Sequence, residues 1–211
     1  NGLFVRVADP FHVRVVELLV EADKFNHYTF DSSLEQVRLG VVISRLKDIT
    51  KTLLKKDLLE LEYIDGTNRI MTSSGSIQRS IRLIRSELMN DIPEVKVGHL
   101  YSLDLDADVL KPFLKAADSK GGMVDVITDN NVLLSCETDE GSVQITVDGD
   151  DASLTPADYV SMTTYSVNEI AKATSTAVGV IGVRGKQNGP LEMRWKTPVG
   201  SMMKSWVAPR L

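Results

Sequence analysis

The chain has 211 residues, 43% of them hydrophobic and 25% charged, and a formal net charge of -5 at pH 7. This length suits two domains of about 100 residues each. The acidic balance excludes a nucleic-acid binder whose whole surface is basic. It does not exclude a protein that gathers its basic residues on one surface and covers the rest with carboxylates.

The sequence holds one cysteine, Cys136, within an apolar run. An internal disulfide is therefore excluded, and we expect a buried, unreactive thiol in a reducing intracellular compartment. No stretch of about 18 apolar residues and no signal-peptide pattern occurs in the sequence. We therefore expect a soluble protein without membrane partners.

The first part of the chain begins with strand patterns and then changes to a helical one. Residues 2–8 and 13–20 alternate between apolar and polar side chains, which predicts two strands separated at Asp9-Pro10. Residues 41–56 have apolar side chains at helical spacing instead. On another face of this predicted helix, three lysines follow one another at intervals of four residues: Lys47, Lys51 and Lys55.

A four-residue motif occurs twice and identifies an internal repeat. Gly75-Ser76-Ile77-Gln78 returns as Gly141-Ser142-Val143-Gln144, and each copy follows two strand-like runs. A helix pattern with lysines four residues apart precedes both copies, with Lys111 and Lys115 in the second. A lysine stripe on one helix is ordinarily a solvated surface. Its recurrence favours one basic surface presented several times to an extended polyanion.

Between the two copies, residues 87–98 show no clear period and contain Ile92-Pro93, which predicts an extended linker. Residues 108–118 then have helical spacing. Pro112 lies inside this segment, and a proline beyond the first turn removes a backbone hydrogen bond and crowds the preceding turn. We therefore expect the helix to start late or to bend.

A weaker third copy of the unit ends the chain. Ser166 and Glu169 have the spacing of a capping box, which predicts a short helix carrying Lys172. Strand patterns follow at residues 178–184, 191–196 and 202–207. The repeating unit is therefore a helix followed by three antiparallel strands.

Three segments together resemble the proliferating cell nuclear antigen (PCNA) family of sliding DNA clamps, in particular its archaeal members. The ending Trp206-Val207-Ala208-Pro209-Arg210-Leu211 is similar to the family's aromatic-aliphatic-Ala-Pro-basic-aliphatic ending. Residues 7–13 (Val-Ala-Asp-Pro-Phe-His-Val) resemble a segment between two strands of the clamp, and residues 113–118 (Phe-Leu-Lys-Ala-Ala-Asp) resemble a pore helix. The resemblance rests on the order and spacing of these segments, and it covers essentially the whole chain.

The resemblance implies an α+β protein with the DNA clamp fold. It implies two similar domains, with antiparallel sheets outside and pore-lining helices inside, in a ring of three identical subunits. The corresponding boundaries are residues 1–86 for an N-terminal clamp domain that is incomplete at its start, 87–99 for an interdomain connector, and 100–211 for a C-terminal clamp domain. Such a ring encircles double-stranded DNA without reading its sequence and acts as a DNA polymerase processivity factor.

Lysines on the pore helices would contact the regular phosphate backbone at any register, so that the ring can slide. The positions predicted for these DNA contacts are Lys47, Lys51, Lys55, Lys111, Lys115, Lys120 and Lys172.

The family also binds short peptide motifs of DNA polymerase, clamp loader, flap endonuclease and ligase between the connector and the C-terminal tail. The residues of this chain that correspond to the peptide groove are Ala8, His12, Val13, Val15, Ile92, Pro93, Pro190, Leu191, Trp206, Val207, Ala208 and Pro209. The alternative for each apolar member is a place in the core, and Trp206 fits either the core or the rim.

Clamp rings close by antiparallel pairing between edge strands of neighbouring subunits, which satisfies backbone groups that an open edge leaves unpaired. The predicted interface residues are Ser76, Ile77, Arg79, Ile81, Leu83, Ser142, Val143, Ile145 and Val147. They fall in the two copies of the repeated motif.

Clamps of this family have a strand, a pore-lining helix and a strand before the point that corresponds to residue 1, a unit of roughly 30 residues. The sequence lacks them, so we expect an N-terminally truncated or incompletely represented clamp; a natural short variant is the alternative. Loss of one pore helix would expose part of the first domain's sheet and weaken ring closure.

Two other functions were weighed. Catalysis is not expected, because the alternating carboxylates at Asp104, Asp106 and Asp108 precede a helix, where they favour its amide groups, and no nucleophile matches the histidines. We therefore predict no enzyme, no cofactor and no metal.

The other alternative is a clamp-like protein that forms no ring and binds or sequesters replication partners. A clamp would be cytoplasmic and nucleoid-associated in an archaeon, and nuclear in a eukaryote.

Overall fold

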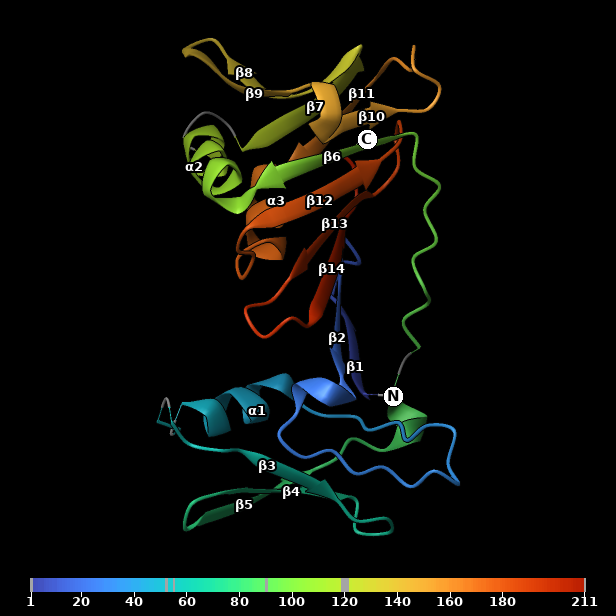
Figure 1. The fold of residues 1–211 in the computed structure, drawn as a ribbon, viewed down its shortest axis with the longest axis vertical. Helices are drawn as coiled ribbons and strands as arrows, with labels where there is room; N and C mark the ends of the chain where they lie inside the picture. Colours follow the sequence, from blue (N-terminus) through green and yellow to red (C-terminus); the bar gives the residue numbers. More distant parts are fainter. Residues whose placement is uncertain (1, 52, 55, 90, 119–121, 211) are drawn as a thin grey trace. The chain divides into compact units, whose positions relative to one another are not determined.

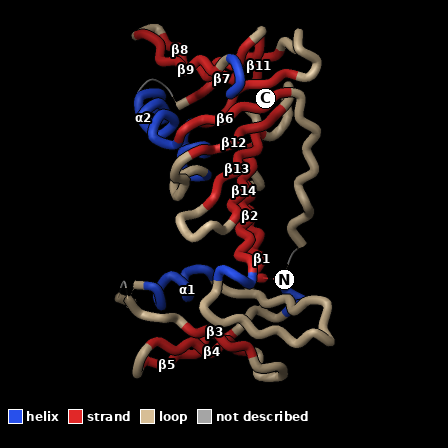
Figure 2. Tube along the Cα trace, viewed as in Figure 1, coloured by secondary structure: helices blue, strands red, loops and turns tan. Residues whose placement is uncertain are grey.

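The computed structural model describes residues 2–210 except 52, 55, 90 and 119–121. The chain divides into a larger unit, Asn1–Tyr28 with Ile92–Leu211, and a smaller unit, Thr29–Asp91. Each unit has its own antiparallel sheets (Figures 1 and 2).

The larger unit is built on a seven-stranded sheet in the order β1-β2-β14-β13-β12-β6-β10. Its strands are β1 (Gly2–Ala8), β2 (Arg14–Glu21), β6 (Tyr101–Asp106), β10 (Ala152–Leu154), β12 (Val180–Gly185), β13 (Leu191–Lys196) and β14 (Met202–Val207). Two of the sequence segments that predict strands at opposite ends of the chain are therefore neighbours, because β2 pairs with β14.

A second sheet of the larger unit has the order β11-β7-β8-β9. Its strands are β7 (Met123–Asp129), β8 (Asn131–Thr138), β9 (Gly141–Val147) and β11 (Ser161–Ser166). Helices α2 (Ala107–Asp118) and α3 (Val167–Ala173) lie side by side on one flank of the unit (Figure 1).

One continuous core joins both sheets and both helices. Phe113 and Leu114 of α2, Ile170 of α3 and Val126 of β7 are all at most 4% exposed. Burial of such apolar side chains is the main favourable term in folding. Cys136 belongs to the same core and is 3% exposed, which confirms the predicted burial of its thiol.

The other face of the seven-stranded sheet carries polar side chains. Residues directly opposite each other in antiparallel strands share a face, and Glu17, Lys204 and Arg194 lie opposite one another on β2, β14 and β13. The connector segment (residues 92–99), which has neither helix nor strand, adjoins this face (Figure 2).

The compact units group the chain differently from the predicted domains. Residues 2–28 were expected in an N-terminal domain ending at residue 86, whereas β1 and β2 continue the sheet of the C-terminal part. The physical reason is the register of β2 with β14, which places Val15 opposite Trp206. The boundaries at residues 87–99 stay a prediction.

The smaller unit has a three-stranded sheet and one helix. The sheet has the order β3-β4-β5, with β3 (Glu60–Tyr63), β4 (Arg69–Ser74) and β5 (Ile77–Arg82), and the helix is α1 (Ile43–Thr50). Ile49, Ile70, Ile81 and Leu83 are buried. The helix is shorter than the predicted residues 41–56.

Helix α2 corrects one expectation about its start. It begins at Ala107, five residues before Pro112, so it does not start late, and the bend expected as the alternative stays a prediction. The Asp106 carboxylate accepts a hydrogen bond of 2.7 Å from the Asp108 backbone N–H and stabilises the first turn. Pro112 and Asp108 are exposed, so water can satisfy the Asp108 carbonyl that a proline leaves without its helical donor.

The predicted capping box of α3 is also corrected. Ser166 is the N-cap residue, but its side chain makes no capping hydrogen bond. Glu169 forms ion pairs with Arg14 and Lys172 instead. The helix therefore begins directly after Ser166, as the spacing of Ser166 and Glu169 predicts, but without the capping hydrogen bond.

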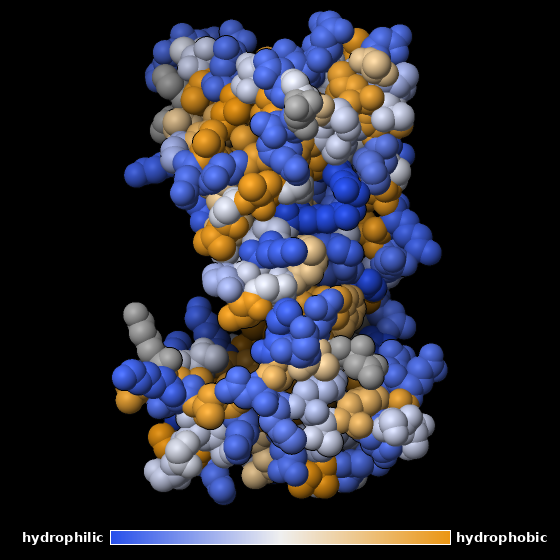
Figure 3. Space-filling view, viewed as in Figure 1, coloured by the Kyte–Doolittle hydropathy of each residue, from blue (hydrophilic) through white to orange (hydrophobic). Residues whose placement is uncertain are grey.

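Several large apolar side chains lie on the surface, and the face in Figure 3 mixes hydrophobic with hydrophilic atoms. The most exposed are Phe11 at 85%, Leu54 at 75% and Leu88 at 72%. Among the described residues, no helix is long and apolar enough to cross a membrane.

Replacing Gly185 with alanine should destabilise the larger unit. A Cβ at this position would lie 2.3 Å from the hydroxyl oxygen of Tyr101, a residue that is only 2% exposed. Overpacking of this kind costs about 1–3 kcal/mol. Gly98→Ala is the control, because nothing lies within 4 Å of its added Cβ. Urea unfolding of both variants measures the difference, and equal midpoints would contradict the packing argument.

Candidate nucleic-acid and peptide interfaces

A groove between α2 and α3 collects lysines on one side of the larger unit. It has a volume of about 310 Å³, and its α2 side carries Lys111 and Lys115. The 3.6-residue period turns both lysines partly, but not fully, away from the core residues Phe113 and Leu114. Their aliphatic stems therefore lie along the groove. Thr174 and Ser175 at the end of α3 form the other side.

The ammonium groups of the groove differ in their partners. Lys111 donates to the carbonyl of Ala177 at 2.6 Å. Lys172 on α3 lies 3.1 Å from Glu169. Lys115 is exposed and has no ion-pair partner within the described part of the chain. Lys115 is therefore the cation of this group that is best placed to meet a phosphate.

The smaller unit places the other predicted lysines on α1 and at its end. Lys47 is exposed, and Lys51, directly after the helix, pairs with Asp48 at 2.8 Å. Exposed pairs of this kind are weak, about 0–1 kcal/mol, so phosphate can replace Asp48 as the partner. Lys55 and Lys120 lie outside the described residues.

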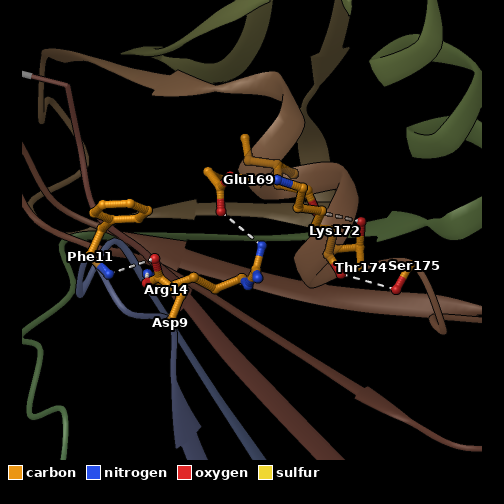
Figure 4. Close-up of polar contacts among 8 residues, drawn as sticks. Asp9, Phe11, Arg14, Glu169, Lys172, Thr174 and Ser175 are labelled. Atoms are coloured by element: carbon orange, nitrogen blue, oxygen red, sulfur yellow. Dashed lines mark hydrogen bonds and ion pairs between the residues drawn. The ribbon is translucent and has the colours of Figure 1, made fainter. Parts of the chain in front are cut away.

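The hairpin between β1 and β2 has a well-defined tip (Figure 4). The Asp9 carboxylate accepts hydrogen bonds from the backbone N–H groups of Phe11 at 3.1 Å and Arg14 at 2.6 Å. His12 has a φ of 56°, which this tight turn requires of it. Arg14 then donates to Glu169 of α3 at 2.8 Å, so the hairpin is tied to the helix that carries Lys172.

The Asp9 carboxyl ionises more readily than an ordinary aspartate. Partial burial opposes its ionisation, but hydrogen bonds from the backbone of Arg14, Phe11 and Val13 and the nearby Arg14 charge outweigh burial and lower its pKa. The tip of the hairpin is thus stabilised by the charged carboxylate.

The structure brings most of the predicted peptide-groove residues to one end of the seven-stranded sheet. Ala8, Val15 and Trp206 form a row on the outward face. The Ala208 backbone N–H donates to the Val13 carbonyl at 2.8 Å, which holds the C-terminal tail against the hairpin. Four other predicted members are half-buried or exposed: Ile92, Pro93, Pro190 and Pro209.

Two groove predictions have a different place. Leu191 and Val207 lie opposite each other on the core face and are 2% and 0% exposed. They support the sheet beneath the groove, because alternation along a strand turns adjacent side chains to opposite faces. Trp206 is 5% exposed, and its indole N–H donates to Glu192 at 3.0 Å.

Sequence patterns missed the charged residues that hold this region. The Arg6 guanidinium donates to Glu17 at 2.5 Å and to the carbonyl of Ile92 at 3.2 Å, which ties the connector segment to β1. Glu17 and Glu192 are each 7% exposed. The alternating pattern of a strand predicts that glutamates on its outward face are exposed to solvent. These two are buried because the connector segment covers them, which the sequence pattern does not indicate.

The predicted interface residues belong to two edge strands. β5 is the last strand of the sheet in the smaller unit, and β9 is the last strand of the second sheet in the larger unit. Ser76 lies in the turn before β5, and Ile77 is 49% exposed. Ile81, Leu83 and Val147 are at most 8% exposed, and Val143 and Ile145 pack against the core. The backbone N–H of Leu83 donates to the carbonyl of Asn68.

The remaining interface arginine, Arg79, has its guanidinium 3.5 Å from the carbonyl oxygen of Asp48. Within the described ranges, no three His, Cys, Asp or Glu side chains lie close enough together to hold a metal ion.

Comparisons with known proteins identify the class. No family model matches the sequence. The DNA polymerase sliding clamp 1 of Pyrobaculum aerophilum is 23% identical over 219 residues, which cover 100% of this chain and 86% of that protein. The DNA polymerase sliding clamp of Nitrosopumilus maritimus is 25% identical over 217 residues and is covered to the same extents.

Solved structures show the same similarity. The complex of the C-terminal region of FEN-1 with PCNA of A. fulgidus contains a chain that matches with a TM-score of 0.87 and 22% identity, over 100% of this chain and 86% of that one. A chain of the PCNA2–PCNA3 complex from Sulfolobus tokodaii matches with a TM-score of 0.76 and 20% identity, over 100% of this chain and 87% of that chain.

These matches define the class of the fold: the chain has the DNA clamp fold. Within that class, the chain resembles the archaeal DNA polymerase sliding clamps, or PCNA, along its full length. The predicted resemblance and fold class are confirmed.

Acidification should loosen the hairpin tip. Because the pKa of Asp9 is lower in the folded chain than its usual value of about 3.9, its contribution is complete above about pH 4 and disappears as the pH falls through the lowered pKa. Asp9→Ala should reduce protection of the Arg14 amide at neutral pH and remove this dependence. Hydrogen exchange read by NMR measures it. Asp23→Ala is the control, because Asp23 bonds to Lys24 instead; equal loss in both variants would contradict the assignment.

Proposed function

We propose that this chain is a subunit of a DNA polymerase sliding clamp, which encircles duplex DNA and tethers replication and repair enzymes to it. The observation that carries the proposal is the similarity of the entire chain to proteins named DNA polymerase sliding clamp. A scaffold of this kind performs no catalysis. Its work is done in the archaeal cytoplasm, at the nucleoid, or in a eukaryotic nucleus.

The DNA contacts are electrostatic in this proposal. Lys115 and Lys111 beside the α2–α3 groove, and Lys47 and Lys51 at α1, meet phosphates of the duplex. Contacts with phosphate alone carry no base information, so the subunit slides instead of stopping at a sequence. A net charge of -5 over the whole chain keeps DNA away from the acidic surface.

Ring closure uses the free edges of β5 and β9. Each strand pairs on one side only in its sheet, and antiparallel pairing between subunits gives partners to the unpaired backbone groups. We propose a homotrimer. Partner enzymes insert short peptide motifs between the connector segment and the hairpin, where Ala8, Val15 and Trp206 form the apolar row.

Charge reversal tests the DNA surface and separates the clamp from a sequestering protein without a ring. The Lys51→Glu, Lys115→Glu double variant should reduce stimulation of polymerase on a long primed template by about tenfold or more. Each reversal replaces an attraction to phosphate with a repulsion. Stimulation by the wild type should itself fall as the ionic strength rises, because contacts with phosphate weaken in salt.

The control for this variant is Lys186→Glu with Lys196→Glu, which makes the same charge change on exposed lysines outside the helices. It should leave stimulation unchanged. Unchanged stimulation by the helix variant would refute the proposed DNA surface, and a protein that gives no stimulation at all would favour sequestration.

Solution mass tests the ring. Sedimentation equilibrium should give 69.9 kDa, three times the 23.3 kDa of one chain. Ile77→Glu, at the 49% exposed first residue of β5, should lower the mass toward 23.3 kDa, because a carboxylate at a paired edge is desolvated. Val199→Glu, at a 67% exposed residue outside both edges, should remain a trimer. A wild-type monomer at all concentrations would sink the homotrimer.

A further inference from the structure

A cavity of about 450 Å³ lies between the connector segment and the outward face of the seven-stranded sheet. Its volume falls within the usual range of ligand pockets, about 300–1,000 Å³. Residues 94–99 form its outer wall. The side chains on its floor come from β2, β13 and β14: Glu17, Glu192, Arg194, Lys204 and Trp206. Only Trp206 of these belongs to the predicted peptide groove, so the cavity adjoins that groove and extends it along the connector.

The carboxylates that line the cavity all have cations already. Glu17 accepts from Arg6 at 2.5 Å. Glu192 accepts from Arg194 and also from the Trp206 indole. The third, Glu94, lies 3.4 Å from Lys96 on the connector. Buried carboxylates need such partners because an uncompensated charge is costly away from water.

One cation on the floor has no such partner. Lys204 lies directly opposite Glu17 and Arg194 in the strand register, but its ammonium group forms no ion pair with any described residue. The side chain of Lys204 is half-buried. Arg194 beside it is already paired with Glu192, so Lys204 is the lining cation without an ion-pair partner among the described residues. The unbalanced charge in the cavity is therefore positive.

We propose that this cavity receives an acidic side chain, the carboxylate of an aspartate or glutamate, from a peptide that runs along the connector. Lys204 pairs with the carboxylate, and the indole of Trp206 contacts the aliphatic part of the same side chain. The proposal rests on the proposed function, because it extends the peptide site of a clamp. It adds a charge requirement: partners with an acidic residue at the connector side bind more tightly than those without one.

The test uses two blocked tetrapeptides, tetraglutamate and tetraglutamine, as probes. The readout is the NMR signal of the Trp206 indole N–H, assigned with Trp206→Phe. Trp195, the other tryptophan, lies on the core face at 2% exposure and is the internal reference. Tetraglutamate should shift the Trp206 signal and leave the Trp195 signal in place. Tetraglutamine should shift neither.

Variants identify the cation. Lys204→Gln should weaken tetraglutamate binding about tenfold, the usual effect of one charge-assisted hydrogen bond, and Lys204→Arg should preserve it. Lys196→Gln is the matched control, since it removes an exposed lysine from the same face of the neighbouring strand outside the cavity. Thermal unfolding checks that each variant is folded.

Four results overturn the inference: no shift with tetraglutamate, an equal shift with tetraglutamine, an equal shift with inorganic phosphate, or unchanged binding in Lys204→Gln. Failure of the clamp function is distinguishable from these. It shows as a monomeric mass and no polymerase stimulation, while the tetraglutamate titration still reports on Lys204. In the converse case, a trimer that stimulates polymerase but ignores tetraglutamate would leave the clamp standing and remove the acidic subsite.

Discussion

The antiparallel pairing of β2 with β14 is the interaction on which the surface features of the larger unit depend. It joins the start of the chain to its end over six residue pairs, from Met202 with Leu19 to Val207 with Arg14. Without it the apolar row at Ala8, Val15 and Trp206 would not exist, because its members come from residues nearly 200 positions apart. The same register places Lys204 beside Glu17 and so creates the cavity under the connector.

The two faces of that sheet have opposite chemistry for a simple reason. Alternation along each strand sends Met193, Trp195 and Val207 into the core and Glu192, Arg194 and Trp206 outward. A sheet packed on both faces would normally be apolar on both. Here the second cover is only the connector segment, so the outward side chains are charged and neutralise each other in pairs, as Arg6 does Glu17.

Local sequence patterns predicted the strands well. They could not predict which strands pair when the two lie far apart in the sequence. The strands at residues 2–8, 13–20, 191–196 and 202–207 appear within two residues of their predicted ends, because alternation and turn residues are local signals. Asn188, at a φ of 54°, lies in the turn between β12 and β13, and an Asn-Gly sequence favours such turns. The pairing of β2 with β14 has no local signal and was not predicted, because residues 1–86 were assigned to a separate N-terminal domain. Buried Glu17 and Glu192 had none either, since their burial comes from a segment far away in the sequence.

The surroundings of the lysines likewise depend both on local helical spacing and on packing between segments that are distant in the sequence. Helical spacing places Lys111 and Lys115 on one side of α2, but only the packing of α3 against α2 turns that side into a groove. Arg14 reaches from the β1–β2 hairpin to Glu169, and Glu169 also holds Lys172 (Figure 4). The hairpin next to the apolar row and the helix next to the lysine groove thus share one carboxylate.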